Sequence, residues 1–363
     1  MNRPLIDKPE TLAALVAALS RENELALDTE FMRERTYYPR LCLVQLATND
    51  RISCVDPLAL RELGPLDELL ARNSVRTVLH AARQDIETWL TRCSRVPASV
   101  FDTQVAAALL GLPPQIGYGD LVEKRLGVQL DKAHARTDWA ARPLSAEQLQ
   151  YAAEDVQYLL PLRRVLQEEL QRLQRLDWFE YEMQRILDPG LYRTEPEEAW
   201  LRLKGLAGFD NRRAEVARAL AEWRERRAMQ KDRPRAWILA DDALYDIARA
   251  LPSRRDGLER LVSLPRGLID NCAEELLEVV GRSAHLGEEP LTARRRQRPS
   301  AESEQRLKAL SAIVKRIAQE VSLTPEVLAT RRDLMGILNG RRDVEPLKGW
   351  RRDVVGNALL AAL

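Results

Sequence analysis

The stretch LALDTEF, residues 25–31, constrains the fold of this chain more than any other. Leucine, threonine and phenylalanine alternate with Ala26, Asp28 and Glu30, and this period of two is typical of a β-strand. A strand would place both carboxylates on one face, where each raises the pKa of the other unless a cation lies between them. The stretch therefore predicts a metal-binding strand or, as is commoner for such a triplet taken alone, a half-buried strand with a solvated acidic edge.

Length and cysteine usage limit the class of protein. The chain has 363 residues, enough for two or three domains with separate cores. Its four cysteines are scattered and form no C-x-x-C pair, so neither a thiolate zinc site nor a disulfide framework is indicated. No apolar run reaches the roughly 18 residues that a bilayer span needs. We therefore expect a soluble, cytoplasmic protein with no membrane partner.

Charge is distributed unevenly along the chain. Residues 1–200 hold 24 Lys and Arg against 31 Asp and Glu, a net charge of −7, whereas residues 201–363 hold 32 against 24, a net charge of +8. An acidic half beside a basic half fits a metal-dependent site coupled to a module that binds a polyanion. Because arginine-rich surfaces are often merely solvated, this asymmetry favours a nucleic-acid partner only weakly.

Strand signals follow the acidic stretch. Residues 41–47 and 51–55 are β-rich runs on either side of the turn at 48–50, which predicts a hairpin. Residues 74–79 predict a short strand and residues 80–90 a helix, so a βα unit is expected here. Asp85 falls in the first turns of that helix, near the carboxyl end of the strand, where open α/β sheets usually place their sites.

Residues 100–104 predict the opening of a further apolar helix, with Asp102 as its cap.

A later helix carries two more polar candidates. Ser145 and Gln148 fit a capping box, and an apolar stripe runs from Leu149 to Leu160. Tyr151 and Asp155 are four residues apart on this helix, so a phenol and a carboxylate project from the same face. An ordinary pair on a helix surface is the alternative, because this spacing is very common.

Beyond Pro189 the strand signals stop. Residues 196–280 predict helices, residues 281–304 a solvated linker that includes an arginine-rich run, and residues 305–363 helices again. Several residues between Ala219 and Leu244 recur 90 positions later, which suggests two divergent copies of one helical module; the alternative is chance, because matches are frequent in a chain so rich in Ala, Leu and Arg.

The motifs occur together in a familiar order: Asp28 and Glu30 in LALDTEF, Asp85 in HAARQDIE, and Tyr151 with Asp155 in YAAEDVQYL. In this order the chain resembles the DEDD exonucleases of the ribonuclease H-like fold, in the subclass with a tyrosine in the third motif. The stretches YYPRLCLVQLA and DKAHARTDWAARPLS are similar to the ribonuclease D family within that subclass. AWLRLKG, LAEWRERRA, DRPRAWILADDALYDIA and GWRRDVVG resemble helicase-and-RNase-D C-terminal (HRDC) domains.

The resemblance implies an architecture. An α/β ribonuclease H-like exonuclease domain, with a mixed sheet flanked by helices, would occupy residues 1–188. Two all-α HRDC-like domains would follow, the first at 193–280 and the second at 305–363, with the linker at 281–304. The last domain is the most divergent from the family pattern.

The same resemblance implies a mechanism with two divalent cations, Mg²⁺ or Mn²⁺, held by Asp28, Glu30, Asp85 and Asp155. Two such ions about 4 Å apart activate water and stabilise the leaving oxygen of a phosphodiester, and hard cations prefer oxygen ligands. Asp28 would bridge both ions, Glu30 and Asp155 would complete one, and Asp85 would hold the other largely through water. Tyr151 would orient the attacking water.

The implied reaction is hydrolysis from a free RNA 3′ end with release of 5′-mononucleotides, acting on precursor tRNA 3′ ends. Phe31 would stack on or wedge against a terminal base, although a phenylalanine in the core is the alternative. Gln45, Lys132, His134 and Arg136 are further candidate RNA contacts. The basic helical domains would bind phosphates, so RNA affinity would fall steeply with salt.

Two rival functions remain open. A DNA 3′→5′ exonuclease on the same fold would carry the same acids, and only RNA offers a 2′-hydroxyl to tell the two substrates apart. A non-catalytic nucleic-acid-binding protein is the second rival, but a pure binder gains nothing from clustered negative charge. The sequence has neither a Cys/His cluster nor a glycine-rich phosphate loop, so a zinc-dependent deaminase or a nucleotide cofactor is not expected.

Overall fold

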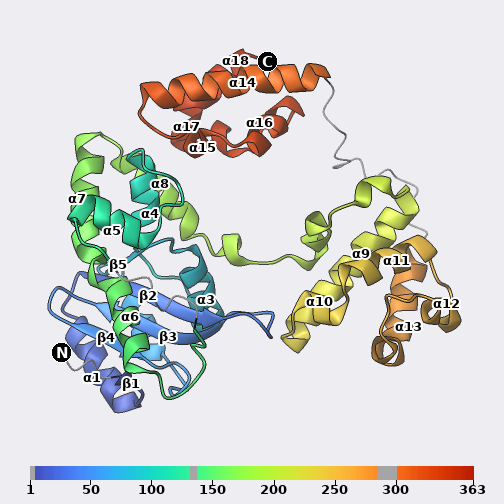
Figure 1. Ribbon diagram of the computed structural model, residues 1–363, viewed down its shortest axis with the longest axis horizontal. Helices are drawn as coiled ribbons and strands as arrows, with labels where there is room; N and C mark the ends of the chain where they lie inside the picture. Colours follow the sequence, from blue (N-terminus) through green and yellow to red (C-terminus); the bar gives the residue numbers. More distant parts are fainter. Residues whose placement is uncertain (1–4, 131–136, 284–300) are drawn as a thin grey trace. The chain divides into compact units, whose positions relative to one another are not determined.

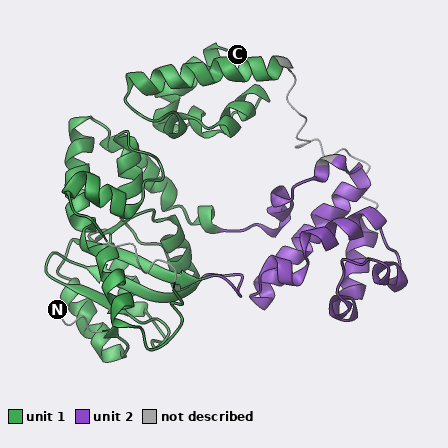
Figure 2. Ribbon diagram, viewed as in Figure 1, with its two compact units in different colours: residues 1–32, 40–192, 299–363 green, residues 33–39, 193–298 purple. Residues whose placement is uncertain are grey.

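The computed structural model describes residues 5–130, 137–283 and 301–363. The chain divides into two compact units, coloured separately in Figure 2. The first unit contains residues 1–32, 40–192 and 299–363, and the second contains residues 33–39 and 193–298. In the described part of the chain we find no helix with the length and apolar character needed to cross a membrane.

A six-stranded mixed sheet forms the centre of the first unit, in the order β1-β4-β3-β2-β5-β6 (Figure 1). The three middle strands β4, β3 and β2 are antiparallel neighbours, whereas β5 runs parallel to β2 and to β6, and β1 runs parallel to β4. The bounds are Leu5–Ile6 (β1), Glu24–Met32 (β2), Arg40–Ala47 (β3), Ile52–Val55 (β4), Arg76–Leu79 (β5) and Val100–Asp102 (β6).

The acidic stretch lies in the sheet interior because its apolar side chains are buried. Leu25 and Leu27 of β2 are almost fully inaccessible and belong to the main apolar core. The predicted hairpin is confirmed: β3 pairs with β4, and a backbone hydrogen bond from Thr48 N to Arg51 O closes the turn at 2.8 Å. The predicted βα unit is also confirmed, with β5 leading into the helix that carries Asp85.

Helices flank this sheet, as the fold-class prediction requires. The helix α6 lies across the face of the sheet in Figure 1. The helices of this region are α1 (Pro9–Leu19), α2 (Gly64–Leu70), α3 (Arg83–Cys93), α4 (Thr103–Leu109), α5 (Tyr118–Leu126), α6 (Ala146–Gln157), α7 (Leu159–Arg172) and α8 (Leu176–Ile186), followed by the 3₁₀ turn η1 (Pro189–Tyr192).

The predicted long helix after Ser145 is two helices in the structure. The helix α6 ends at Gln157, and α7 begins at Leu159. Pro161 explains the break, because proline has no N–H to donate to the carbonyl of Gln157 four residues earlier. The apolar stripe continues across the break, since Val156 and Leu160 are both buried.

The last helical module belongs to the first unit and packs against α8. The rings of Trp178 and Trp350 stack with centroids 4.4 Å apart, and the Trp350 indole donates a 2.9 Å hydrogen bond to Glu182. Gly349 has φ +47°, and a Cβ there would lie 2.3 Å from the Tyr181 ring, so this contact requires glycine. The module comprises α14 (Ala301–Glu320), α15 (Pro325–Leu328), α16 (Arg331–Leu338), η4 (Glu345–Leu347), α17 (Gly349–Arg351), the π-helical turn η5 (Arg352–Gly356) and α18 (Asn357–Ala361).

The second unit is helical and has its own apolar core, which includes Leu220, Leu244, Ile247 and Leu276. It comprises η2 (Pro196–Arg202), η3 (Leu206–Gly208), α9 (Asn211–Lys231), α10 (Arg235–Ile238), α11 (Asp241–Ala250), α12 (Arg255–Glu259) and α13 (Arg266–Ser283). Both α13 and α14 extend into the ends of the predicted linker 281–304, whose residues 284–300 lie outside the described part of the chain.

The two helical modules repeat the same order of elements. The helices α9, α10 and α11 begin at residues 211, 235 and 241, and α14, α15 and α16 begin at 301, 325 and 331. Each start in the second module therefore lies 90 positions after its counterpart in the first. The repeated residue pattern is thus accompanied by a repeated arrangement of helices.

The loop between β2 and β3 is part of the second unit. The Tyr37 hydroxyl donates to the buried Glu225 carboxylate, which also accepts two hydrogen bonds from Arg235. The backbone N–H groups of Tyr37 and Tyr38 both donate to Asp232 at 3.0 Å. Strand β2, which carries Asp28 and Glu30, therefore leads directly into a loop that is hydrogen-bonded within the helical unit.

Candidate active site

Strand β2 brings Asp28 and Glu30 to one face of the sheet. In the antiparallel pairing with β3, Asp28 lies opposite Gln45, and Glu30 lies opposite Leu43. The parallel pairing with β5 involves only Glu24–Ala26, so the other edge of β2 has no β5 partner from residue 27 onward. The site therefore lies where β2 leaves its parallel neighbour.

Helix α6 supplies the third motif. Ser145 and Gln148 form a complete capping box, which confirms the predicted start of the helix. Tyr151 and Asp155 lie one turn apart, and the phenol hydrogen-bonds to the carboxylate. The buried Trp139 lies beside Tyr151, with ring centroids 6.1 Å apart, so the phenol ring is packed on that side.

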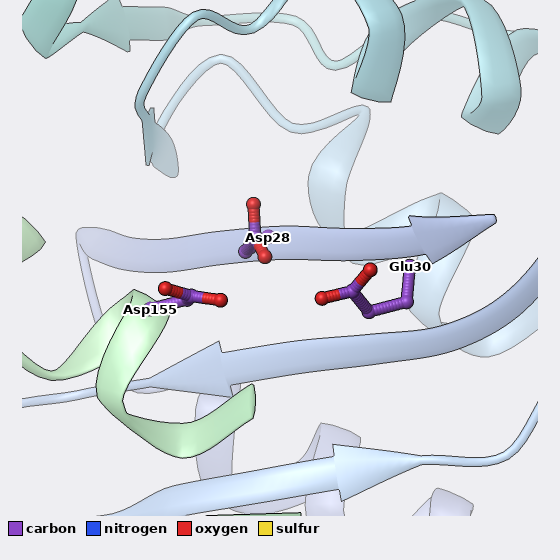
Figure 3. Close-up of side chains that lie close together, drawn as sticks. All are labelled: Asp28, Glu30 and Asp155. Atoms are coloured by element: carbon purple, nitrogen blue, oxygen red, sulfur yellow. The ribbon is translucent and has the colours of Figure 1, made fainter. Parts of the chain in front are cut away.

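Three carboxylates converge although they come from segments far apart in sequence. One oxygen atom from each of Asp28, Glu30 and Asp155 lies within 4.8 Å of the other two. Figure 3 shows the three side chains pointing toward one another, two from β2 and one from α6. Of the two alternatives, this convergence favours the metal-binding strand, because three clustered carboxylates repel one another unless a cation offsets their charge.

Asp85 reaches the site from α3 and is only 7% exposed. Its carboxylate accepts a 2.6 Å hydrogen bond from the Thr29 hydroxyl, between the two acids of β2. Asp102 fixes the start of α3, since its carboxylate accepts from the backbone N–H groups of Ala81 and Ala82 at 3.1 and 2.8 Å. Asp85 is not within the 4.8 Å group, but its charge acts on Asp28.

Without a bound cation, the carboxylates of the site repel one another, and their pKa values are raised. Burial, followed by repulsion from Asp85, Asp155 and Glu30, raises the pKa of Asp28 well above its ordinary value. Burial and the neighbouring acids raise the pKa of Glu30 to about 8. Burial raises the pKa values of Asp85 and Asp155 to about 7, even though hydrogen bonds from Thr29 and Tyr151 act in the opposite direction.

A hard divalent cation fits this donor set. All the candidate ligands are carboxylate oxygens, which Mg²⁺ and Mn²⁺ prefer, and the cluster contains no soft ligand. A cation also removes the repulsion that raises the pKa values, because it stabilises the ionised form of each acid. The acidic cluster therefore indicates divalent-metal binding.

The candidate RNA contacts have different outcomes. Phe31 is half-buried beside a β-bulge and is not part of the apolar clusters formed by the described residues, so the alternative of a core phenylalanine is not favoured. Gln45 is 0% exposed, so its side chain is not accessible to RNA in this structure. Lys132, His134 and Arg136 lie outside the described residues.

The sequence did not predict the contact of Thr29 with Asp85 or the second role of Asp102. The Thr29 hydroxyl was not a candidate, because its alternation places it on the face of β2 opposite Asp28. Asp102 was expected as a helix cap, and its carboxylate does cap α4 through Gln104 and Val105. The expected helix opening at 100–104 was wrong in part, since Val100–Asp102 forms β6 against β5, and Asp102 also holds α3.

Comparisons with known proteins agree with this geometry. A 3′-5′ exonuclease family model matches residues 4–171, and an HRDC domain model matches residues 213–280. A ribonuclease D from Gluconacetobacter diazotrophicus is 40% identical over 98% of this chain and 92% of its own length. The ribonuclease D of Escherichia coli K12 is 31% identical over 99% of this chain and 98% of its own.

A solved structure gives the same result for the whole fold. The crystal structure of Escherichia coli RNase D, described as an exoribonuclease involved in structured RNA processing, matches with a TM-score of 0.89. The match covers 100% of this chain and 99% of that chain. From its motifs, its acidic site and its full-length relatives, the chain belongs to the ribonuclease D family of 3′→5′ exonucleases.

Proposed function

We propose that this 3′→5′ exoribonuclease uses two divalent cations, Mg²⁺ or Mn²⁺, to remove 5′-mononucleotides from RNA, and that it matures the 3′ ends of precursor tRNAs. The observation that carries the proposal is the convergence of Asp28, Glu30 and Asp155 within 4.8 Å, with Asp85 electrostatically coupled to them. Four mutually repelling acids destabilise the fold unless they bind cations. Bound cations are what hydrolysis of an anionic phosphodiester requires.

The residues have distinct proposed roles. Bound cations would neutralise the scissile phosphate and acidify water. Asp28, which is coupled to the other three acids, would contact both cations, while Glu30 and Asp155 would complete one of the two sites. Asp85, held by the Thr29 hydroxyl, would serve the second site. Tyr151 would orient the attacking water from its position beside Asp155.

The substrate proposal depends on relatives and on charge. The relative from Escherichia coli is described as involved in structured RNA processing. In this chain, the segment 201–363 carries a net positive charge and contains two helical modules with the same order of elements. We retain the predicted domains at 1–188, 193–280 and 305–363, with residues 281–304 as the linker between the last two. The helical domains would contact RNA phosphates. Phe31, Lys132, His134 and Arg136 remain predicted contacts near the 3′ end.

The decisive test is digestion of a 5′-labelled RNA hairpin that has a single-stranded 3′ tail. A ladder that shortens from the 3′ end with Mn²⁺ and stops with chelator would support the proposal. A DNA of the same sequence distinguishes the two exonucleases: degradation of DNA at an equal or higher rate would favour the DNA enzyme. Tight RNA binding without any ladder would favour a non-catalytic binder.

Tyr151→Phe is expected to lower kcat by about 100-fold, because a positioned proton-transfer or water-orienting group typically contributes 10²-fold or more. The Tyr151 hydrogen bond lowers the pKa of Asp155, so its loss should raise that pKa further. The acidic limb of the pH–rate profile should therefore move to higher pH. Tyr158→Phe is the matched control, since that hydroxyl accepts a hydrogen bond from Gln157 near the end of the same helix. Equal rates for the two variants would contradict the role of Tyr151.

Trp237→Ala is expected to weaken RNA binding about tenfold and leave kcat at saturating RNA unchanged. Trp237 is 60% exposed on α10, and the Arg233 guanidinium lies 5.9 Å from its ring centroid. An exposed indole beside a cation suits base stacking, which contributes about 1–3 kcal/mol per base. Val262→Ala removes another exposed apolar side chain of the same unit and serves as the control. Filter binding measures both affinities, and an unchanged Trp237→Ala affinity would argue against stacking.

A further inference from the structure

Gln45 has an environment that a side chain of its type rarely tolerates. It is 0% exposed, and neither its amide nitrogen nor its amide oxygen has a hydrogen-bond partner within the described protein. A buried polar group without a partner costs about 1–3 kcal/mol. An apolar residue of similar size, such as methionine, would fill the same space without that cost. The amide therefore needs a hydrogen-bond partner that it does not reach in this structure.

The strand pairing locates that partner. Gln45 lies directly opposite Asp28 across the β2–β3 pair, so both side chains project from the same face. On its other side, Gln45 is paired with the buried Cys54 of β4. Helix α6 covers this face with the apolar Ala152, which packs with Cys42, Leu43 and Cys54. In this cross-strand row, the carboxylate of Asp28 is the strong acceptor beside the amide.

The other acids of the site suggest what the amide does. Asp85 accepts from the Thr29 hydroxyl, and Asp155 hydrogen-bonds with the Tyr151 phenol. Each of these two acids thus has a neutral side-chain donor. A neutral donor orients a carboxylate without competing with a cation, whereas lysine would repel the cation and another acid would add repulsion.

We propose that Gln45 is a positioning residue for metal binding: its amide nitrogen donates a hydrogen bond to the Asp28 carboxylate when Asp28 binds a divalent cation. This assignment replaces the expected RNA contact, and it rests on the proposed metal-dependent reaction. Hydrogen bonds to ligating groups commonly change metal affinity by about 10-fold to 100-fold.

The experiment compares Mn²⁺ binding by wild-type protein, Gln45→Met and Thr77→Val, using calorimetry on the full chain. Thr77 is also 0% exposed with an unpartnered hydroxyl, but it lies on β5 opposite Leu25, so Thr77→Val is a matched control. We expect the Mn²⁺ Kd to rise about tenfold in Gln45→Met and to remain unchanged in Thr77→Val. The chelated Gln45→Met protein should melt no lower than wild type, because methionine removes two unsatisfied polar atoms.

An Mn²⁺ Kd for Gln45→Met within twofold of wild type would overturn the proposal. This readout is independent of the RNA reaction: a protein whose Mn²⁺ affinity depends on Gln45 but that does not degrade RNA would refute the proposed function alone. A measurement on wild-type protein covers the case in which Gln45→Met does not fold. In protein labelled with ¹⁵N-glutamine, Mg²⁺ should shift one side-chain amide, and that amide should be the first that Mn²⁺ broadens. If no amide responds in this way, the proposal is wrong.

Discussion

Asp28→Asn is expected to lower the rate of RNA degradation about 10³-fold or more. The charges of Glu30, Asp85 and Asp155 all act on Asp28, so its loss affects the whole cation site. Metal-assisted stabilisation of transition-state charge contributes several kcal/mol, and each 1.36 kcal/mol is tenfold in rate. The rate is measured on 5′-labelled RNA at saturating Mn²⁺, so that weakened metal binding does not account for the whole loss.

The same substitution is expected to stabilise the chelated protein. Asparagine has nearly the shape of aspartate but carries no charge to be buried among Glu30, Asp85 and Asp155. The melting temperature without metal should therefore rise while the activity is lost. Asp50→Asn, in the exposed turn between β3 and β4, is the control and should change neither quantity. A variant at Asp28 that keeps a tenth of the wild-type rate would contradict the assigned role.

The chelated protein is expected to lose stability as the pH rises from about 5 to 8. The folded pKa values are about 8 for Glu30 and about 7 for Asp85 and Asp155, all above the ordinary values near 4. In this window the folded state holds protons that the unfolded chain has released. The contribution of these protonated acids to the free energy of unfolding is complete below about pH 4, and it disappears as the pH rises through their folded pKa values. Each extra proton contributes a slope of about 1.4 kcal/mol per pH unit.

Among the groups with lowered pKa values, His80 opposes this trend at the acidic end of the window, because burial lowers the pKa of its imidazole below the ordinary value near 6.5, but it is one group against four acids. Burial alone would raise the pKa of Asp56 and Glu225, but hydrogen bonds from Arg142 and Arg235, respectively, lower both values. Their contribution to stability is lost only as the pH falls below about 4.5, outside the window.

Mn²⁺ should reverse the direction of the pH effect. The cation binds the ionised carboxylates, so its affinity, and the stability that it adds, increase as the acids lose their protons. Denaturant melts at pH 5, 6, 7 and 8, with chelator and with Mn²⁺, give both series. The Asp28→Asn variant should show a shallower decline with chelator. Stability that rises with pH in chelated wild-type protein would contradict the electrostatic description of the site.

Local sequence patterns predicted much of the fold because the physical determinants are local. The alternation around Asp28 specifies a strand, and the polar turn at 48–50 specifies a hairpin. The capping box at Ser145 specifies where α6 begins. Tyr151 and Asp155 share a helix face by the geometry of a single turn. The family's motifs then identified Asp85 as the remaining acid, which periodicity alone did not distinguish from an ordinary helix residue.

Residues 100–104 and Gln45 show where local patterns fail. Val100–Asp102 is too short to have a recognisable period, and it forms a strand because β5 offers it a parallel partner. A glutamine on a strand normally indicates a solvent-exposed position, but α6 covers this face of the sheet, and Gln45 is buried. Both errors concern partners that are distant in sequence.

The sequence by itself determined strands β2 to β5, the helix faces, the repeat of the helical modules and the candidate catalytic motifs. These depend on side-chain periodicity, on caps and on residue types, which act over a few positions. Only the tertiary structure decided that Asp28, Glu30 and Asp155 lie within 4.8 Å, that Thr29 holds Asp85, and that Gln45 faces Asp28 without a protein partner. The physical reason is that burial, repulsion and hydrogen bonding between distant segments depend on how the chain packs, and that packing is a property of the whole fold.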